Sequence, residues 1–163
     1  MNQLIAAIDV KGGIADDSGI PWQGRIPSDS QYFVDQTSTG TIVMGYRTYE
    51  ELDHPLGTAV NLVAVRAGSS PPLRAGFVAV VDLEPIFHQD PDALIWVIGG
   101  AEIFRQSMSF AEELYITQLQ EDFRCTKFFP EFSSDFHLSD SRRPLTEDGI
   151  QFQFEIWQRN GVT

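Results

Sequence analysis

The stretch IWVIGGAEIF, residues 95–104, decides the fold that this sequence predicts. Its first four residues are apolar and mostly β-branched, as in a buried strand, and from Ala101 onward the pattern is that of a helix. The pair Gly99-Gly100 allows close backbone approach in the turn between them. The stretch therefore predicts a strand–turn–helix unit whose helix N-terminus can bind a pyrophosphate. A simple turn that needs glycine explains the pair as well, and the GxGxxG of a Rossmann fold is absent.

A second stretch, IVMGYRTYEEL at residues 42–52, repeats the pattern nearer the N-terminus. Gly45 ends a predicted strand, and Arg47 and Thr48 stand in the first turn of the helix that follows. A basic residue is unfavourable at that end of the helix dipole, so an anionic ligand would explain Arg47. An exposed arginine that reaches solvent explains it equally well. Two such junctions in one chain favour a phosphate-bearing cofactor.

Short apolar runs recur outward from these junctions and alternate with segments of helical length. The predicted strands are residues 4–8, 41–44, 60–65, 77–81 and 94–98, and the predicted helices lie near 28–37, 46–52, 82–88 and 101–108. This alternation predicts an α/β fold with a central, mostly parallel sheet and helices on both faces. The last strands, at residues 113–119, 135–141 and 150–158, have no helices between them. They predict an antiparallel C-terminal hairpin.

Length and charge limit the possible functions. With 163 residues, 42% of them hydrophobic, the chain is expected to form a single domain over residues 1–163. The formal net charge of −12 argues against binding to nucleic acid or to an anionic membrane surface. Cys125 is the only cysteine, which excludes an internal disulfide and a cysteine metal cluster and favours the cytoplasm. We expect no signal peptide and no membrane span.

An acidic residue stands among aromatics in GIPWQGRIPSDSQYF, residues 19–33. Ser28 is predicted to cap a helix whose inward positions include Asp29 and Phe33. In the simplest interpretation Asp29 only favours the helix dipole. A carboxylate in an aromatic pocket is costly to bury unless a polar ligand pairs with it, which makes Asp29 a candidate for anchoring a ligand or handling a proton.

These stretches, in this order, resemble the dihydrofolate reductase family. LIAAIDVKGGIADDSGIPW resembles the family's first strand and mobile loop, and IPSDSQYF resembles its acid-bearing helix. IVMGYRTYEEL, WVIGGAEIF and LYITQLQEDFRCTKFFPEF resemble three further family segments, so the match covers essentially the whole chain. The resemblance implies NADPH-dependent reduction of 7,8-dihydrofolate to tetrahydrofolate, with hydride transfer to C6 and protonation of N5. It also implies a monomer that binds dihydrofolate and antifolate-type small molecules.

The resemblance assigns roles residue by residue. Asp29 is implied to bind the pterin with support from Thr117 through a water, while Trp22 and Ile20 belong to a loop, residues 12–22, that closes over the nicotinamide. The implied substrate-binding residues are Ile5, Ala6, Asp29, Phe33, Leu52, Leu56, Ile98 and Thr117. The implied cofactor-binding residues are Ala7, Ile14, Gly45, Arg47, Thr48, Arg66, Gly99, Gly100, Ala101, Glu102, Ile103 and Phe104, with a cis peptide between Gly99 and Gly100. No metal is implied.

The sequence departs from the family pattern at several of these positions. Tyr46 replaces the usual arginine after Met-Gly, Val65 and Arg66 replace small hydroxyl residues, Phe104 replaces a tyrosine and Thr126 an aspartate. These changes leave the choice of NADPH over NADH open.

The far end of the substrate site departs as well. In PLGTAVN, residues 55–61, Ala59 stands where the family has the arginine that holds the folate glutamate tail. Neighbouring positions that are basic in some relatives carry Val34 and His54. We therefore expect weakened recognition of the tail, unless Arg25 or another arginine reaches it. The alternative functions are a related pyrimidine or pterin reductase of the same fold and a non-catalytic nucleotide-binding relative.

Overall fold

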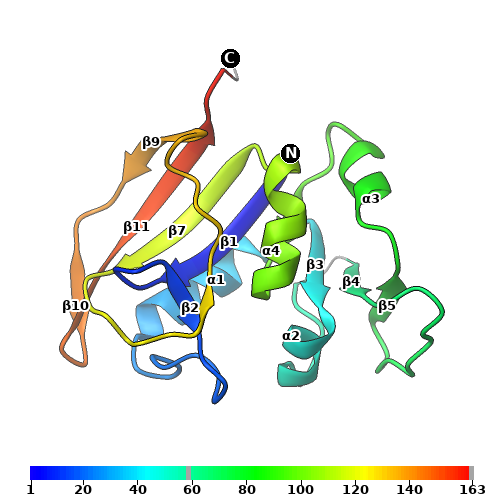
Figure 1. Ribbon diagram of the computed structural model, residues 1–163, viewed down its shortest axis with the longest axis horizontal. Helices are drawn as coiled ribbons and strands as arrows, with labels where there is room; N and C mark the ends of the chain where they lie inside the picture. The colour runs from blue at the N-terminus through cyan, green and yellow to red at the C-terminus, as the bar shows by residue number, and fades with distance from the viewer. Residues whose placement is uncertain (58–59, 162–163) are drawn as a thin grey trace.

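The strand β1 (Asn2–Ile8) lies in the interior of the sheet because its residues are apolar on both faces. The computed structural model describes residues 1–57 and 60–161 (Figure 1). Leu4 is buried against one face and Ile5 against the other. Since successive side chains in a strand alternate between faces, a strand covered on both sides has a continuous apolar run. The run at residues 4–8 is therefore confirmed as a central strand.

The sheet has the order β10-β11-β7-β1-β6-β3-β4-β5, with β9 beside β11. All pairings from β7 to β5 are parallel, while β11 runs antiparallel to β7, β9 and β10. The predicted parallel centre and antiparallel C-terminal hairpin are both confirmed. The other strands of this sheet are β3 (Thr41–Gly45), β4 (Asn61–Ala64), β5 (Phe77–Val80), β6 (Ile95–Val97), β7 (Glu113–Leu119), β9 (Phe136–Ser141), β10 (Leu145–Glu147) and β11 (Ile150–Arg159).

Helices cover both faces of the sheet, as the alternating pattern predicts. In Figure 1, α4 lies on the viewer's side and α1 on the far side. Tyr32 and Tyr49 belong to one buried apolar cluster, here called the α1–α2 cluster, and Ile86 and Phe104 to the other, the α3–α4 cluster. The helices are α1 (Pro27–Gln36), α2 (Tyr46–Glu51), α3 (Glu84–His88) and α4 (Ala101–Ser107), followed by a 3-10 turn at Met108–Phe110.

Two short strands outside the main sheet were not predicted. β2 (Gly13–Ala15) pairs with β8 (Lys127–Phe128) in an antiparallel ribbon of its own. β10 also escaped prediction, because three residues carry too little pattern to reveal a strand. In the part of the chain that the structure describes, no helix is both long enough and apolar enough to cross a membrane.

The buried carboxylate of Asp9 joins the loop after β1 to the loop after β7. Its Oδ1 accepts hydrogen bonds from the backbone N–H groups of Lys11 and Gly13 at 2.9 and 2.8 Å, and its Oδ2 accepts one from Phe123 at 3.0 Å. The Phe123 ring in turn packs edge-on against Trp22, with centroids 5.1 Å apart. Asp9 therefore helps to position the segment that carries Trp22.

Candidate active site

Two strand–glycine–helix junctions lie side by side at the carboxyl ends of β3 and β6. The N–H of Gly45 donates a 2.7 Å hydrogen bond to the carbonyl oxygen of Gly99, and the Gly99-Gly100 peptide is cis, as the resemblance implied. Gly99 has φ +120°, and a Cβ there would lie 3.2 Å from the ring of Phe104. Glycine is needed at this position for both reasons. Thr48 lies beside the pair, since a Cβ on Gly100 would be 4.0 Å from its Oγ1.

The carboxyl group of Asp29 lies between α1 and the sheet. Thr117 on β7, only 2% exposed, donates its hydroxyl hydrogen to Oδ1 of Asp29 at 2.7 Å. The implied support of the pterin contact by Thr117 through a water stays a prediction, and this direct hydrogen bond to Asp29 is a further contact. The register pairs Thr117 with Ala7 of β1 and with Phe154 of β11, so Thr117 lies in the interior of the sheet.

Burial raises the pKa of Asp29, and the negative charge of Glu147 raises it further, while the hydrogen bond from Thr117 lowers it. Desolvation is the largest of these effects because it disfavours the ionised form. The interpretation of Asp29 as an ordinary first-turn acid does not explain this environment. A carboxyl group with a raised pKa and a single buried hydrogen-bond donor is suited to hold a proton or to bind a polar ring.

Most of the predicted substrate residues meet on the Asp29 side of the sheet. Ile5 and Trp22 are buried in the α1–α2 cluster, and Trp22 is only 3% exposed. Ile20, two residues earlier, is 40% exposed. Ala6 lies on the opposite face and packs against the α3–α4 cluster. Partly buried against the α1–α2 cluster are Phe33, Leu52, Leu56 and Ile98. Ala7, which the resemblance implied as a cofactor residue, packs against the same cluster.

Four of the predicted cofactor residues line a large cavity: Arg47, Arg66, Glu102 and Ile103. This cavity of about 1030 Å³ is lined by Arg47 and Arg66, with Tyr46, Glu50 and Glu102 also in its wall. Arg47 is exposed and donates to the carbonyl oxygen of Asp17 at 3.3 Å. Ile103 lies in the same wall, whereas Ile14, Ala101 and Phe104 belong to the α3–α4 cluster and do not line the cavity. Two arginines in one cavity favour an anionic ligand.

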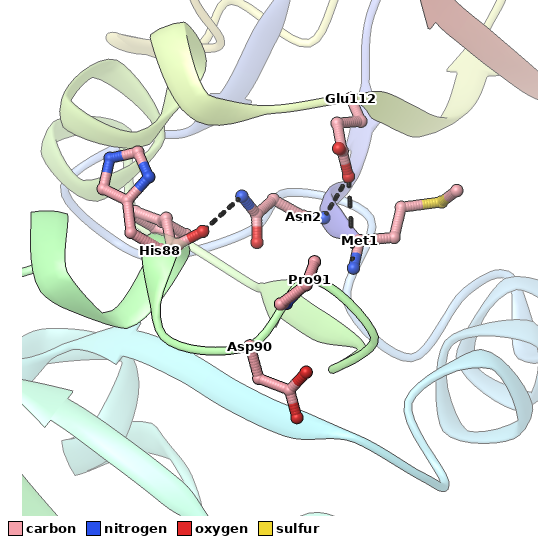
Figure 2. Close-up of a pocket in the computed structure, with 7 residues that line it drawn as sticks. Met1, Asn2, His88, Asp90, Pro91 and Glu112 are labelled. Carbon is pink, nitrogen blue, oxygen red and sulfur yellow. Dashed lines mark hydrogen bonds and ion pairs between the residues drawn. The ribbon is translucent and has the colours of Figure 1, made fainter.

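A second cavity, of about 310 Å³, lies beside the N-terminus and contains none of the predicted site residues (Figure 2). Several of its polar groups are already paired with one another. Glu112 accepts a hydrogen bond from the backbone N–H of Asn2 at 2.8 Å and lies 4.0 Å from the amino group of Met1. The Asn2 side chain donates to the carbonyl oxygen of Phe87 at 3.3 Å. These mutual contacts make it a weaker candidate for a ligand site.

The prediction that Ser28 caps α1 is wrong. The residue before the helix is Ile26, without a side-chain cap, and Ser28 lies inside the first turn. Its N–H and hydroxyl instead donate to the carboxylate of Glu147, at 3.0 and 2.6 Å. Sequence reasoning did not identify Glu147, because the contact spans 119 positions and no local pattern marks it.

The residues predicted near the folate glutamate tail are Val34, His54, Ala59 and, as the alternative, Arg25. Ala59 lies outside the described residues. Val34 is 53% exposed, and Nδ1 of the exposed His54 lies 3.0 Å from the carbonyl oxygen of Pro55. Arg25, the alternative partner of the tail, is paired elsewhere: its Nε lies 2.7 Å from Oδ2 of Asp148.

A profile of the dihydrofolate reductase family matches residues 1–159. The chain belongs to the dihydrofolate reductase family. The expected activity, NADPH-dependent reduction of 7,8-dihydrofolate, is the activity of this family of oxidoreductases. The resemblance read from the sequence is thereby confirmed at the level of family, fold and reaction.

Individual relatives agree with this assignment along the whole chain. The dihydrofolate reductase of Bacillus subtilis is 30% identical over 159 residues, covering 96% of this chain and 92% of the relative. That of Aedes albopictus is 27% identical over 180 residues, covering 96% of each. The structure of the Enterococcus faecalis enzyme complexed with NADP(H) and RAB-propyl is similar in fold, with a TM-score of 0.82 and 23% identity over 98% of this chain and 96% of the other.

The raised pKa of Asp29 predicts a pH-dependent cost to stability. Between the unfolded value of 3.8 and the raised folded value, the folded state binds more protons, so stability falls as the pH rises through this window. Asp29→Asn, which keeps an oxygen for Thr117 but cannot ionise, should therefore unfold at higher urea than the wild type at pH 7. The gain should shrink at pH 4. Asp35→Asn, exposed on the same helix, is the control, and an equal gain at both pH values would contradict the prediction.

Proposed function

We propose that Asp29 is the residue on which reduction of 7,8-dihydrofolate to tetrahydrofolate depends in this chain. The observation that carries the proposal is the partly buried Asp29 carboxyl, which accepts a hydrogen bond from Thr117 on the face of the sheet where Ile5 and Phe33 belong to the α1–α2 cluster. An apolar surface suits the flat pterin ring, and one carboxyl group within it fixes the orientation of that ring. Antifolate-type molecules share this chemistry and would occupy the same place.

The two oxygens of Asp29 have different tasks in this proposal. Oδ1 accepts the hydroxyl hydrogen of Thr117, which leaves Oδ2 to accept hydrogen bonds from the ring N–H and 2-amino group of the pterin. NADPH, when bound, supplies the hydride that C6 receives. The desolvated carboxyl of Asp29 holds the pterin ready for protonation at N5, which is the work of a general acid–base group. Trp22 and the loop around it exclude water from the reacting atoms.

The residues around the large cavity fit the phosphates of NADPH. Arg47 and Arg66 both line it, and arginine forms charge-assisted, bidentate hydrogen bonds with phosphate. Thr48 and the Gly99-Gly100 pair lie at the junctions next to it. We assign Ala7, Ile14, Gly45 and residues 101–104 to the same cofactor site, as the resemblance implied.

Replacing Asp29 by Asn tests the proposed role directly. Loss of a general acid–base group lowers rates by about 100-fold or more, and we expect that loss in kcat near neutral pH. A spectrophotometric assay with NADPH and dihydrofolate measures it. Unchanged activity in Asp29→Asn would remove the mechanism, and a wild type inactive with dihydrofolate would favour the pyrimidine reductase or the non-catalytic alternative.

Arg66→Ala should separate the two nicotinamide cofactors. We place Arg66 at the 2′-phosphate, the one phosphate that NADPH has and NADH lacks. A lost charge-assisted hydrogen bond is worth roughly 1.5 to 3 kcal/mol, so the KM for NADPH should rise by about 10- to 100-fold while the KM for NADH hardly changes. Arg143→Ala is the matched control, because Arg143 is exposed in the loop after β9, away from the cavity wall. Equal changes for both cofactors, or a wild-type preference for NADH, would contradict the assignment of Arg66.

We further propose that recognition of the folate glutamate tail is weakened because alanine occupies position 59. Alanine cannot replace a bidentate arginine, so Ala59→Arg should lower the KM for dihydrofolate by about one to two orders of magnitude with little change in kcat. A dihydropterin without glutamate is the control substrate and should not respond. A wild type that already strongly prefers the glutamate-bearing substrate, with no response to Ala59→Arg, would place the tail elsewhere.

One domain over residues 1–163 and a monomeric state also remain proposals. The single domain is supported by the sheet order, in which β1 lies between β6 and β7, so that early and late parts of the chain share one sheet. A single cooperative unfolding transition, and sedimentation at the 18.3 kDa of one chain, are the expected observations.

A further inference from the structure

The turn between β10 and β11 holds the first turn of α1. Glu147 is the last residue of β10, and Asp148 and Gly149 form the two-residue turn with φ values of 48° and 73°. Positive φ at both positions is the mark of a type I′ turn, whose twist matches that of the strands. Glu147 is thus held at a fixed place, paired in register with Ile150.

The carboxylate of Glu147 takes the part that a cap residue usually plays. The residue at the N-cap position is Ile26, which has no side-chain acceptor, and Pro27 has no N–H to donate. Oε1 of Glu147 accepts the N–H of Ser28 at 3.0 Å, and Oε2 accepts its hydroxyl at 2.6 Å. A negative charge at the N-terminus of the ten-residue helix is also favourable for the dipole.

The antiparallel part of the sheet contacts both Asp29 and the residue before it. β11 follows the turn and pairs with β7, so that Phe154 lies opposite Thr117. Thr117 binds the Asp29 carboxyl, while Glu147 binds the residue directly before Asp29. The helix turn that carries Asp29 is therefore held from β7 and β10, the two strands that flank β11 in the antiparallel part of the sheet.

We propose that Glu147 is a positioning residue for Asp29: its carboxylate fixes the first turn of α1 and places a second negative charge near the Asp29 carboxyl. This inference rests on the proposed role of Asp29. A like charge disfavours ionisation, so Glu147 keeps Asp29 protonated to a higher pH than burial alone achieves. The fall in the rate of reduction with rising pH then occurs at a higher pH than it would without Glu147.

The other titratable groups at this corner act mainly on Tyr32. Burial raises the pKa of Tyr32 to about 12, Arg142 opposes that rise, and Tyr115, Asp29 and Asp140 add to it. The Arg142 guanidinium lies 5.3 Å from the Tyr32 ring centroid. Glu147 differs from these groups because it holds the residue directly before Asp29, through two hydrogen bonds from Ser28.

The experiment measures the pH dependence of hydride transfer together with the titration of the Asp29 carboxyl by carbon-detected NMR. Glu147→Gln keeps an oxygen for the Ser28 N–H but removes the charge, and it should lower both midpoints by about half a pH unit or more. Above the midpoint the rate should fall by about three- to tenfold, since a unit of pH changes the protonated fraction tenfold. Ser28→Ala loses only the hydroxyl bond and should leave the midpoints in place.

Asp148→Asn is the matched control. It removes the same charge one residue away, where Asp148 is paired with Arg25 and exposed, and should shift neither midpoint. Unmoved midpoints in Glu147→Gln, or an equal shift in Asp148→Asn, would overturn the inference. A wild-type rate profile that survives in Asp29→Asn would instead overturn the proposed role of Asp29. The NMR midpoint would still report on Glu147 in that case.

Discussion

The hydrogen bond from Thr117 to Asp29 is the interaction on which the site depends, because it joins the first turn of α1 to the middle of the sheet. A carboxyl group is costly to remove from water, and one hydroxyl donor compensates only part of that cost. The remainder appears as the raised pKa of Asp29. A group left partly unsatisfied in the folded chain is one that a bound ligand can satisfy, which connects the stability cost to function.

The parallel centre of the sheet explains where the other groups gather. β1, β3 and β6 run in the same direction, so their carboxyl ends meet at one edge. Asp9 follows the first of these strands, Gly45 ends the second and Gly99 lies just beyond the third. Open parallel sheets bind ligands outside this edge, since loops there are free to vary while the strands hold them in place. The cavity lined by Arg47 and Arg66 lies where this rule places it.

The segment that carries Trp22 is held by packing as well as by hydrogen bonds. Asp9 binds the backbone of Phe123, whose ring contacts Trp22, and Gly13 leaves no space for a side chain because a Cβ would lie 2.4 Å from that of Cys125. Burial raises the pKa of the Cys125 thiol to about 11, with Asp9 adding to the effect. Thiols in that state are poor nucleophiles, which is consistent with a packing role for Cys125.

The sequence by itself determined most of the strands and helices, the two glycine junctions and the place of Asp29 in the first turn of α1, because these patterns extend over a few neighbouring residues. The short strands β2, β8 and β10 left no such pattern. The family resemblance of the sequence also supplied Thr117 and the cis peptide. Only the tertiary structure decided that Thr117 contacts Asp29 directly and that Arg25 pairs with Asp148. It also decided that the hydrogen-bond acceptor at the start of α1 is Glu147 and not Ser28. Each of these contacts joins residues about 90 to 120 positions apart and exists because β7 lies between β1 and β11. Strand order is set by how the whole chain packs, and no local pattern records it.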